Sequence, residues 1–279
     1  MANEVTKQEN NIISGDAFDF NAFSGTGVSG IDVNQSDMKL PKYKLLQATS
    51  LEVSKSGGKL HAGQFYNTVT GEAVDEIEAV LLDQGKSMVM WNEKFKRGEE
   101  PICRSFDGKV KAEGCGDGNC ETCQYSSQNS KAWEEAKKQN KNKPGCSMSY
   151  VFICLDVRTN TPFRLIVSGA SVGNGKAFIN KLVPLMEKHN MPIYATKCKF
   201  SSHQEENDQG TYYVVDIAGP MPNNTALNSD GTRNENVWEQ LKKNASVYKK
   251  LFMTSIVQND VVDVDVQPVE EEGESGGLF

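Results

Sequence analysis

Apolar and polar positions alternate with a period of two along several stretches of the chain, and with a helical period along two others. The alternating stretches, together with others that are rich in β-branched and aromatic residues, predict strands at residues 77–83 and 87–93, 150–157 and 162–168, and 193–202 and 211–218. The first two would form a hairpin across residues 84–86, and a polar loop at 203–210 would separate the last two. Apolar residues at helical spacing predict helices at 176–190, despite Pro184, and at 235–254. The chain is therefore expected to be mainly β, in the α+β class.

This order of elements favours a small curled sheet. Antiparallel hairpins with a helix between the fourth and fifth strands suit an OB-like (oligonucleotide-binding) antiparallel barrel, here with a C-terminal helix. An unrelated α+β domain is the alternative.

Composition along the chain predicts three regions. Residues 1–37 are rich in Asn, Ser, Gly and Asp and are expected to be a disordered acidic arm. Residues 38–254 would form the core, and residues 255–279 a disordered acidic tail. The core is interrupted at residues 97–146, a polar stretch with five of the seven cysteines, which we call the cysteine-rich segment.

Charge is distributed unevenly along the chain. The net charge is -7, and the seven acidic residues beyond Lys250, with no Lys or Arg among them, account for all of it. Residues 1–37 hold six acids and one Lys, so residues 38–250 hold 29 basic and 24 acidic residues. A mildly basic body between two acidic arms suggests that the body meets a polyanion.

The overall composition indicates a water-soluble protein. Hydrophobic residues make up 38% of the chain and the mean hydropathy is -0.52. No apolar run approaches the roughly 18 residues that a membrane helix needs, so no membrane association is expected. The N-terminus lacks the features of a signal region, which predicts a cytoplasmic location, in the host cell if the protein is viral. In that compartment cysteines favour metal binding or buried thiols over disulfides.

The cysteine spacing predicts a structural Zn²⁺ site. Cys120 and Cys123 form a C-x2-C pair, whose thiolates can bind one tetrahedral ion from a tight turn. Cys103 and Cys146, at the two ends of the segment, are the preferred second pair, and Cys115 is an alternative to Cys103. Metal binding would supply the folding free energy that this polar segment lacks. A redox pair or unligated thiols are the alternative interpretation.

The two other cysteines and the histidines do not suggest an active site. Cys154 and Cys198 lie in predicted strands and are expected to be buried. None of His61, His189 and His203 pairs with an acid or nucleophile in a recognisable pattern, and no phosphate-binding loop has the required spacing. The protein is therefore not expected to be an enzyme.

Aromatic and basic residues are interleaved as single-strand binding requires. Such proteins combine a cationic groove for phosphates with aromatic side chains that stack on bases. If the aliphatic face of strand 150–157 is the core, Tyr150 and Phe152 would line the groove. The complete predicted nucleic-acid-binding set is Trp91, Lys94, Phe95, Lys96, Arg97, Arg104, Tyr150, Phe152, Arg164, Lys197, Lys199 and Tyr212. A core role for the aromatics and an edge-strand role for the two lysines are the alternatives.

The C-terminus carries a family resemblance. Its residues Glu270, Glu271, Glu272, Glu274, Leu278 and Phe279 place acids before a terminal aromatic residue. In this it resembles phage-type single-stranded DNA-binding proteins, which implies that the tail binds replication or recombination proteins and competes with DNA. The cysteine-rich segment is similar to the zinc-bearing binder of T-even phages, but that family has a His ligand and this segment contains no His. Residues 40–47 and 62–72 also resemble a widespread group of phage early proteins.

We therefore expect a sequence-independent single-stranded DNA-binding protein of a phage or mobile element, which protects DNA and recruits partners. The alternative is a zinc-containing regulator or adaptor of a polymerase or nuclease. A zinc-dependent nuclease or deaminase lacks the residues for general acid–base chemistry.

Overall fold

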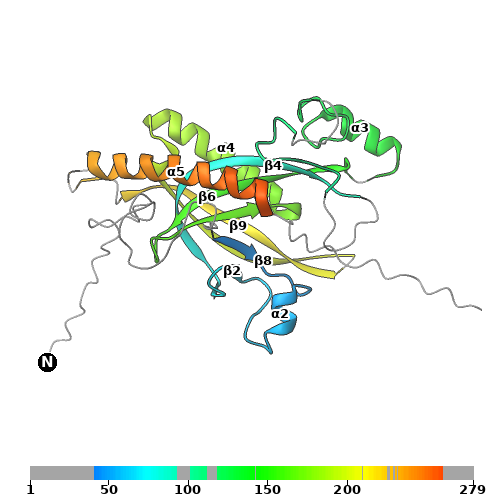
Figure 1. Ribbon diagram of the computed structural model, residues 1–279, viewed down its shortest axis with the longest axis horizontal. Helices are drawn as coiled ribbons and strands as arrows, with labels where there is room; N and C mark the ends of the chain where they lie inside the picture. The colour runs from blue at the N-terminus through cyan, green and yellow to red at the C-terminus, as the bar shows by residue number, and fades with distance from the viewer. Residues whose placement is uncertain are drawn as a thin grey trace, which may run out of the picture.

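The structure is a computed structural model that describes residues 41–92, 101–111, 118–141, 143–208, 210–224, 227–228, 230 and 232–259. Within them, one nine-stranded sheet is flanked by helices (Figure 1). The strands are β1 (Lys42–Leu45), β2 (Phe65–Asn67), β3 (Ala73–Val74), β4 (Ile77–Met90), β5 (Cys103–Ser105), β6 (Cys146–Asp156), β7 (Pro162–Val167), β8 (Thr196–Asn207) and β9 (Gly210–Pro222). The helices are α2 (Leu51–Lys55), α3 (Ser130–Lys138), α4 (Val172–His189) and α5 (Glu235–Asn259), with 3-10 turns η2 (Gly169–Ser171) and η3 (Ile193–Ala195).

The sheet is centred on β4 and β6. Its order is β3-β2-β1-β7-β6-β4-β8-β9, with β5 paired to β4, and only the β1–β7 pairing is parallel. The predicted hairpin across residues 84–86 is wrong, because β4 continues through them as one strand. Gln84, Gly85 and Lys86 pair with residues of β6, which is long enough to supply partners to both halves of β4.

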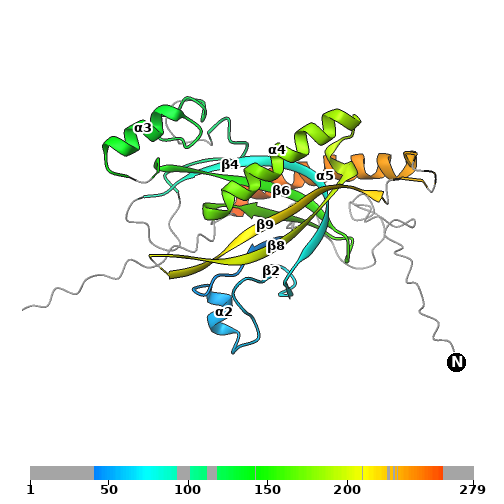
Figure 2. The same ribbon diagram turned by 180° about the vertical axis from the view of Figure 1, so that it is seen from behind.

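Both faces of the sheet are buried, as the two hydrophobic clusters show. On one face Phe152 and Phe200 pack with Phe178 of α4. On the other, Val151 and Ile153 pack in the cluster that contains Trp238 of α5. Figure 1 shows α5 in front of the sheet, and Figure 2, from behind, shows α4 in front. The two predicted helices are thus confirmed, and they cover opposite faces.

The strands β8 and β9 form a ribbon that is longer than predicted. The expected loop at 203–210 is wrong, since β8 runs to Asn207 and β9 starts at Gly210. The register includes the pairs Glu205–Tyr212 and Gln204–Tyr213, in which tyrosines of high β propensity extend the ladder. The ribbon extends beyond the body of the sheet (Figure 2).

Side chains near β1 and β2 bridge the curled sheet to this ribbon. The Gln47 amide donates to the Tyr213 carbonyl (2.9 Å), and the Tyr213 N–H donates to Gln47 Oε1 (2.8 Å). Ser202 Oγ donates to the Gly63 carbonyl (2.6 Å). The fold is thus mainly β with a curled half-barrel sheet, which is consistent with an OB-like barrel. Among the described helices, none has both the length and the apolar character needed to cross a bilayer.

Candidate functional site

The predicted groove-lining residues of β6 and β7 lie in the interior. Phe152 is fully buried, Tyr150 is 5% exposed and Arg164 is 6% exposed. Desolvation by burial raises the pKa of Tyr150 above its ordinary value. The expectation that Tyr150 and Phe152 face an open groove is therefore wrong, because α4 covers the face that carries them. Arg164 pairs with Ile153 on the opposite face and is buried there, so it is not available to a nucleic acid either.

The two lysines of β8 are paired with carboxylates of the neighbouring strand region. Lys197 Nζ lies 2.7 Å from Glu78, and Lys199 Nζ lies 2.6 Å from Glu76. In the antiparallel register of β4 with β8, Lys199 lies opposite Glu78 and Lys197 lies opposite Val80, so each lysine reaches diagonally to its carboxylate. Each lysine is therefore locally neutralised, which reduces its electrostatic attraction for a phosphate.

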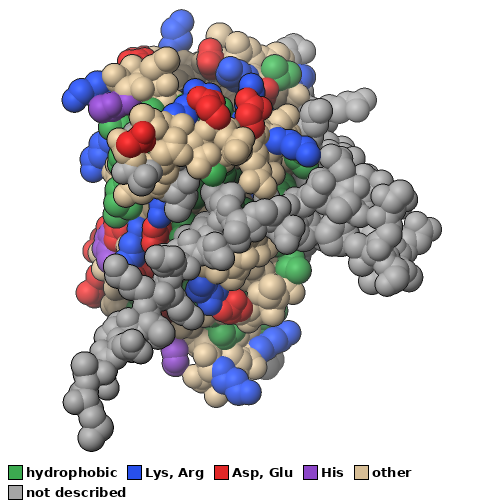
Figure 3. Space-filling model, turned by 90° about the vertical axis from the view of Figure 1, so that its left-hand side faces the viewer, with side chains coloured by type: hydrophobic (Ala, Val, Ile, Leu, Met, Phe, Trp, Pro, Cys, Tyr) green, Lys and Arg blue, Asp and Glu red, His purple; other side chains and the backbone are tan. Residues whose placement is uncertain are grey.

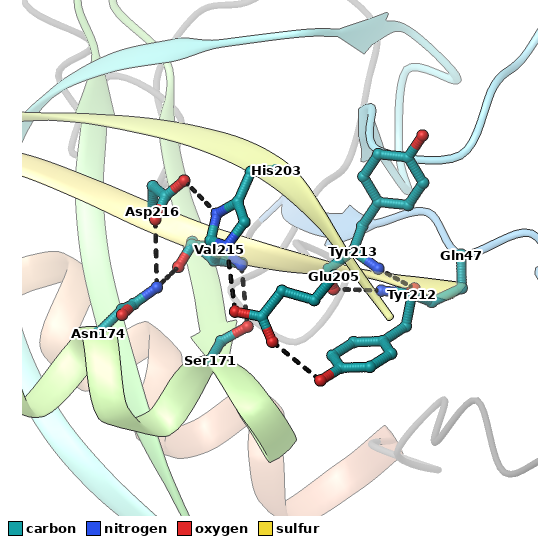
Figure 4. A network of polar contacts seen from close by, with 9 residues as sticks. All are labelled: Gln47, Ser171, Asn174, His203, Glu205, Tyr212, Tyr213, Val215 and Asp216. Carbon is teal, nitrogen blue, oxygen red and sulfur yellow. Dashed lines mark hydrogen bonds and ion pairs between the residues drawn. The ribbon is translucent and has the colours of Figure 1, made fainter. Parts of the chain in front are cut away.

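Tyr212 belongs to a polar network on the β8–β9 ribbon (Figure 4). Its hydroxyl donates to Glu205 (2.8 Å), whose other oxygen lies 3.1 Å from His203 Nε2. His203 Nδ1 lies 2.5 Å from Asp216, and Asn174 of α4 donates to that same carboxylate (3.2 Å). The network therefore joins the two strands of the ribbon to α4.

The charges of this network favour a protonated histidine. The hydrogen bond with Asp216, and then that with Glu205, raises the pKa of His203 above its ordinary value. Hydrogen bonds from Tyr212 and then His203 lower the pKa of Glu205. Both ring nitrogens face carboxylates, and an imidazolium can donate to both. A protonated His203 would therefore hold Glu205 of β8 and Asp216 of β9 together by charge-assisted hydrogen bonds.

The sequence interpretation missed this histidine cluster. With residues 203–210 taken as a loop, nothing places His203 and Asp216 together. Had the strands been extended, period-two alternation would have put residues 203, 205, 212 and 216 on one face of the ribbon.

The end of β4 carries two further predicted residues that stay accessible. Trp91 directly follows β4 and is partly exposed, and Arg104 of β5 pairs with Val89 and is also partly exposed. The Arg104 guanidinium lies over the ring of Phe106, 5.7 Å from its centroid. The other predicted residues of this region, Lys94, Phe95, Lys96 and Arg97, lie outside the described residues.

The cysteine-rich segment brings its described cysteines to the same end of the sheet. Cys103 and Cys146 are the cross-strand partners of Met90 on its two sides, so the three side chains project from one face. Cys120 and Cys146 are buried in one cluster with Met88. Cys123 is half-buried in a turn where its N–H donates to the Asn119 carbonyl (3.1 Å).

These thiols have the donor chemistry of a zinc site, but the described residues do not complete one. Across the described ranges, no group of three or more potential metal ligands lies close enough to hold an ion. Cys115, the alternative ligand, lies outside those ranges. The predicted burial of Cys154 and Cys198 is confirmed. Desolvation by this burial is the main reason that the pKa of the Cys154 thiol is raised well above its ordinary value.

The same segment exposes apolar side chains that were not among the predicted binding residues. Tyr125, Trp133, Ile102 and Val110 are each at least 40% exposed. The helix carrying Trp133 buries only Ala132 and Ala136. The sequence signal for this exposure is the pair of alanines four residues apart in α3. They form the buried side of the helix, so Trp133, next to Ala132, lies off that side.

At the end of the molecule away from the cysteine-rich segment, the surface carries both basic and acidic side chains. Figure 3 shows basic and acidic side chains interspersed on that face.

The predicted tail residues Glu270, Glu271, Glu272, Glu274, Leu278 and Phe279 lie outside the described residues, as do residues 1–37.

Comparison with family models gives one finding for this chain: the model of the Pam3 phage gp34-like protein matches residues 7–246, which is most of its length. The search of curated proteins and the search of solved structures found no match.

Proposed function

Since the chain belongs to the Pam3 phage gp34-like protein family, we propose that it is a phage single-stranded DNA-binding protein. In this role it protects single strands without sequence preference and recruits replication or recombination proteins through its acidic tail. The role is one of binding and not of catalysis.

The observation that carries the proposal is the pairing of accessible aromatic and cationic groups at the end of β4. Trp91 is partly exposed there, and the guanidinium of Arg104 lies over the ring of Phe106. Aromatic rings stack on any base, and cations contact phosphates, so the combination binds single strands of any sequence. Lys94 to Arg97 follow Trp91 in the sequence and add three cations and one aromatic residue. The curled antiparallel sheet is a scaffold compatible with this function.

A structural Zn²⁺ in the cysteine-rich segment is part of the proposal. Cys120, Cys123 and Cys146 would supply three ligands, with Cys103 or Cys115 as the fourth, and their thiols would have to move closer together on binding the ion. The burial of Cys120 and Cys146 beside Met88 supports this set, since both thiols lie in one sheltered cluster. When bound, the ion would stabilise the fold of a polar segment.

A second function has one observation in its favour. Ile102 and Val110 are aliphatic residues that are more than half exposed, and exposed aliphatic residues suit a protein partner. This favours a zinc-containing regulator or adaptor of a polymerase or nuclease.

Fluorescence anisotropy with a labelled oligo-dT, across a salt series, tests the proposal. The full chain should bind with an affinity that falls as salt rises. A chain ending after Asn259 should bind more tightly at low salt, because it lacks the seven acids that compete with phosphates. If neither form binds, the protein-binding alternative replaces this function.

A further inference from the structure

We propose that the cysteine-rich segment presents a second contact surface for single-stranded DNA, in which Tyr125 and Trp133 stack on bases and lysines of α3 contact phosphates. This surface lies on residues other than those predicted from the sequence. It rests on the proposed function and extends the path of the strand from the end of β4.

Trp133 has the geometry of a stacking platform. In α3, Ala132 and Ala136 are buried, while the Trp133 side chain is 40% exposed. Its indole Nε1 donates to the Ser127 carbonyl (2.9 Å), which ties one edge of the ring to the segment. A ring already fixed at one edge loses little conformational freedom when a base stacks on it.

Tyr125 stems from the same short stretch of chain. It is 49% exposed, and its carbonyl accepts from the Cys146 N–H (2.8 Å). The Ser127 N–H donates to the Cys146 carbonyl (3.1 Å). Residues 125–127 are thus fixed against the start of β6. Tyr125 belongs to this stretch, and Trp133 is hydrogen-bonded to it through Ser127.

The charge around these rings is complementary to a phosphate backbone. Residues 130–143 contain five lysines and two glutamates. Glu135 is already engaged by Lys138 (3.6 Å) and by Gln139 (3.1 Å). Lys137 is exposed and lies four residues after Trp133, so both side chains project from the same side of the helix.

This chemistry selects a single strand over a duplex. In a duplex the base faces are stacked on one another, and only the phosphates would be available to this surface. In a single strand, unpaired bases can stack on the two rings while the lysines contact phosphates.

The test uses the full-length protein and oligo-dT anisotropy, with Trp133→Ala, Tyr125→Ala and Lys137→Ala. The matched controls lie on the exposed side of α4: Val183→Ala for the apolar residues and Lys188→Ala for the lysine. Each aromatic change should weaken binding by about five- to 150-fold. Lys137→Ala should reduce the salt slope by about one, and both controls should bind as the unmodified protein does.

One further variant and one further measurement keep the proposal testable if an alanine variant fails to fold. Trp133→Phe should retain most of the affinity, because phenylalanine keeps a stacking face. Comparison of its tryptophan emission with that of the unmodified protein should show that DNA quenches Trp133. Unchanged affinity in folded Trp133→Ala and Tyr125→Ala variants would overturn this surface and leave the proposed function intact. Absence of binding by the unmodified protein would overturn both.

Discussion

The side-chain amide of Gln47 takes the place of a neighbouring strand for Tyr213. It donates to the Tyr213 carbonyl at 2.9 Å and accepts from the Tyr213 N–H at 2.8 Å. Strand β9 ends the sheet order, so this side of Tyr213 has no strand partner in the described sheet. The contact thus joins the end of β1 to β9 and protects part of an exposed edge.

Gln47→Ala should destabilise the protein by about 1–2 kcal/mol, because it removes two hydrogen bonds from a partly buried backbone site. The measurement is urea unfolding monitored by circular dichroism. Gln124→Ala is the matched control, since Gln124 is exposed, and it should leave the unfolding free energy almost unchanged. Equal stability of the two variants would show that the bridge contributes nothing.

The approach of Gly63 to the Tyr213 ring makes a second prediction. Gly63 has φ +92, and a Cβ there would lie 2.5 Å from Tyr213 Cε1. Gly57 has φ +63, but no atom lies within 4 Å of its virtual Cβ. Both Gly→Ala changes carry backbone strain, and Gly63→Ala should cost about 1–3 kcal/mol more because of overpacking. Thermal and urea unfolding of the two variants measure this difference, and equal costs would contradict the close packing.

His203 should make the ribbon sensitive to pH. Its folded pKa is raised above the ordinary value of about 6.5 by Asp216 and Glu205. The stabilisation from its protonated form is therefore complete below about pH 6.5 and is lost as pH rises through the folded pKa. The difference in unfolding free energy between the unmodified protein and His203→Gln should shrink over that range. A difference that grows with pH would contradict the assignment.

Metal content tests the zinc proposal. Purified protein should contain about one zinc per chain by elemental analysis, and the double variant Cys120→Ser, Cys123→Ser should contain little. Chelation should lower the thermal stability of the unmodified protein, because the polar segment depends on the ion. Cys198→Ala is the control: its thiol lies in the sheet core, so this variant should keep its zinc. Zinc retained by the double variant would exclude the C-x2-C pair as ligands.

Elements with a clear local pattern of apolar residues could be predicted from the sequence. Features that depend on which strand or helix packs alongside could not. The helix over α4 was predicted because its apolar residues have helical spacing, and β7 because its residues alternate. The predicted hairpin at 84–86 is wrong, since Gly85 sits in a continuous strand that β6 pairs from Ala79 to Met90, with one register shift between Leu81 and Asp83. Alternation in β6 distinguishes two faces, but no local signal shows that α4 and α5 cover both. This is why Phe152 was assigned to a groove.

The proposed function requires that the protein prefers single strands to duplexes. The most direct measurement is anisotropy of the full-length protein with a labelled oligo-dT and with a duplex of equal length, at one moderate salt concentration. Binding to oligo-dT should be substantially tighter, because only unpaired bases can stack on the exposed aromatic side chains. Equal affinity for the two ligands, or binding to neither, would contradict the proposed function.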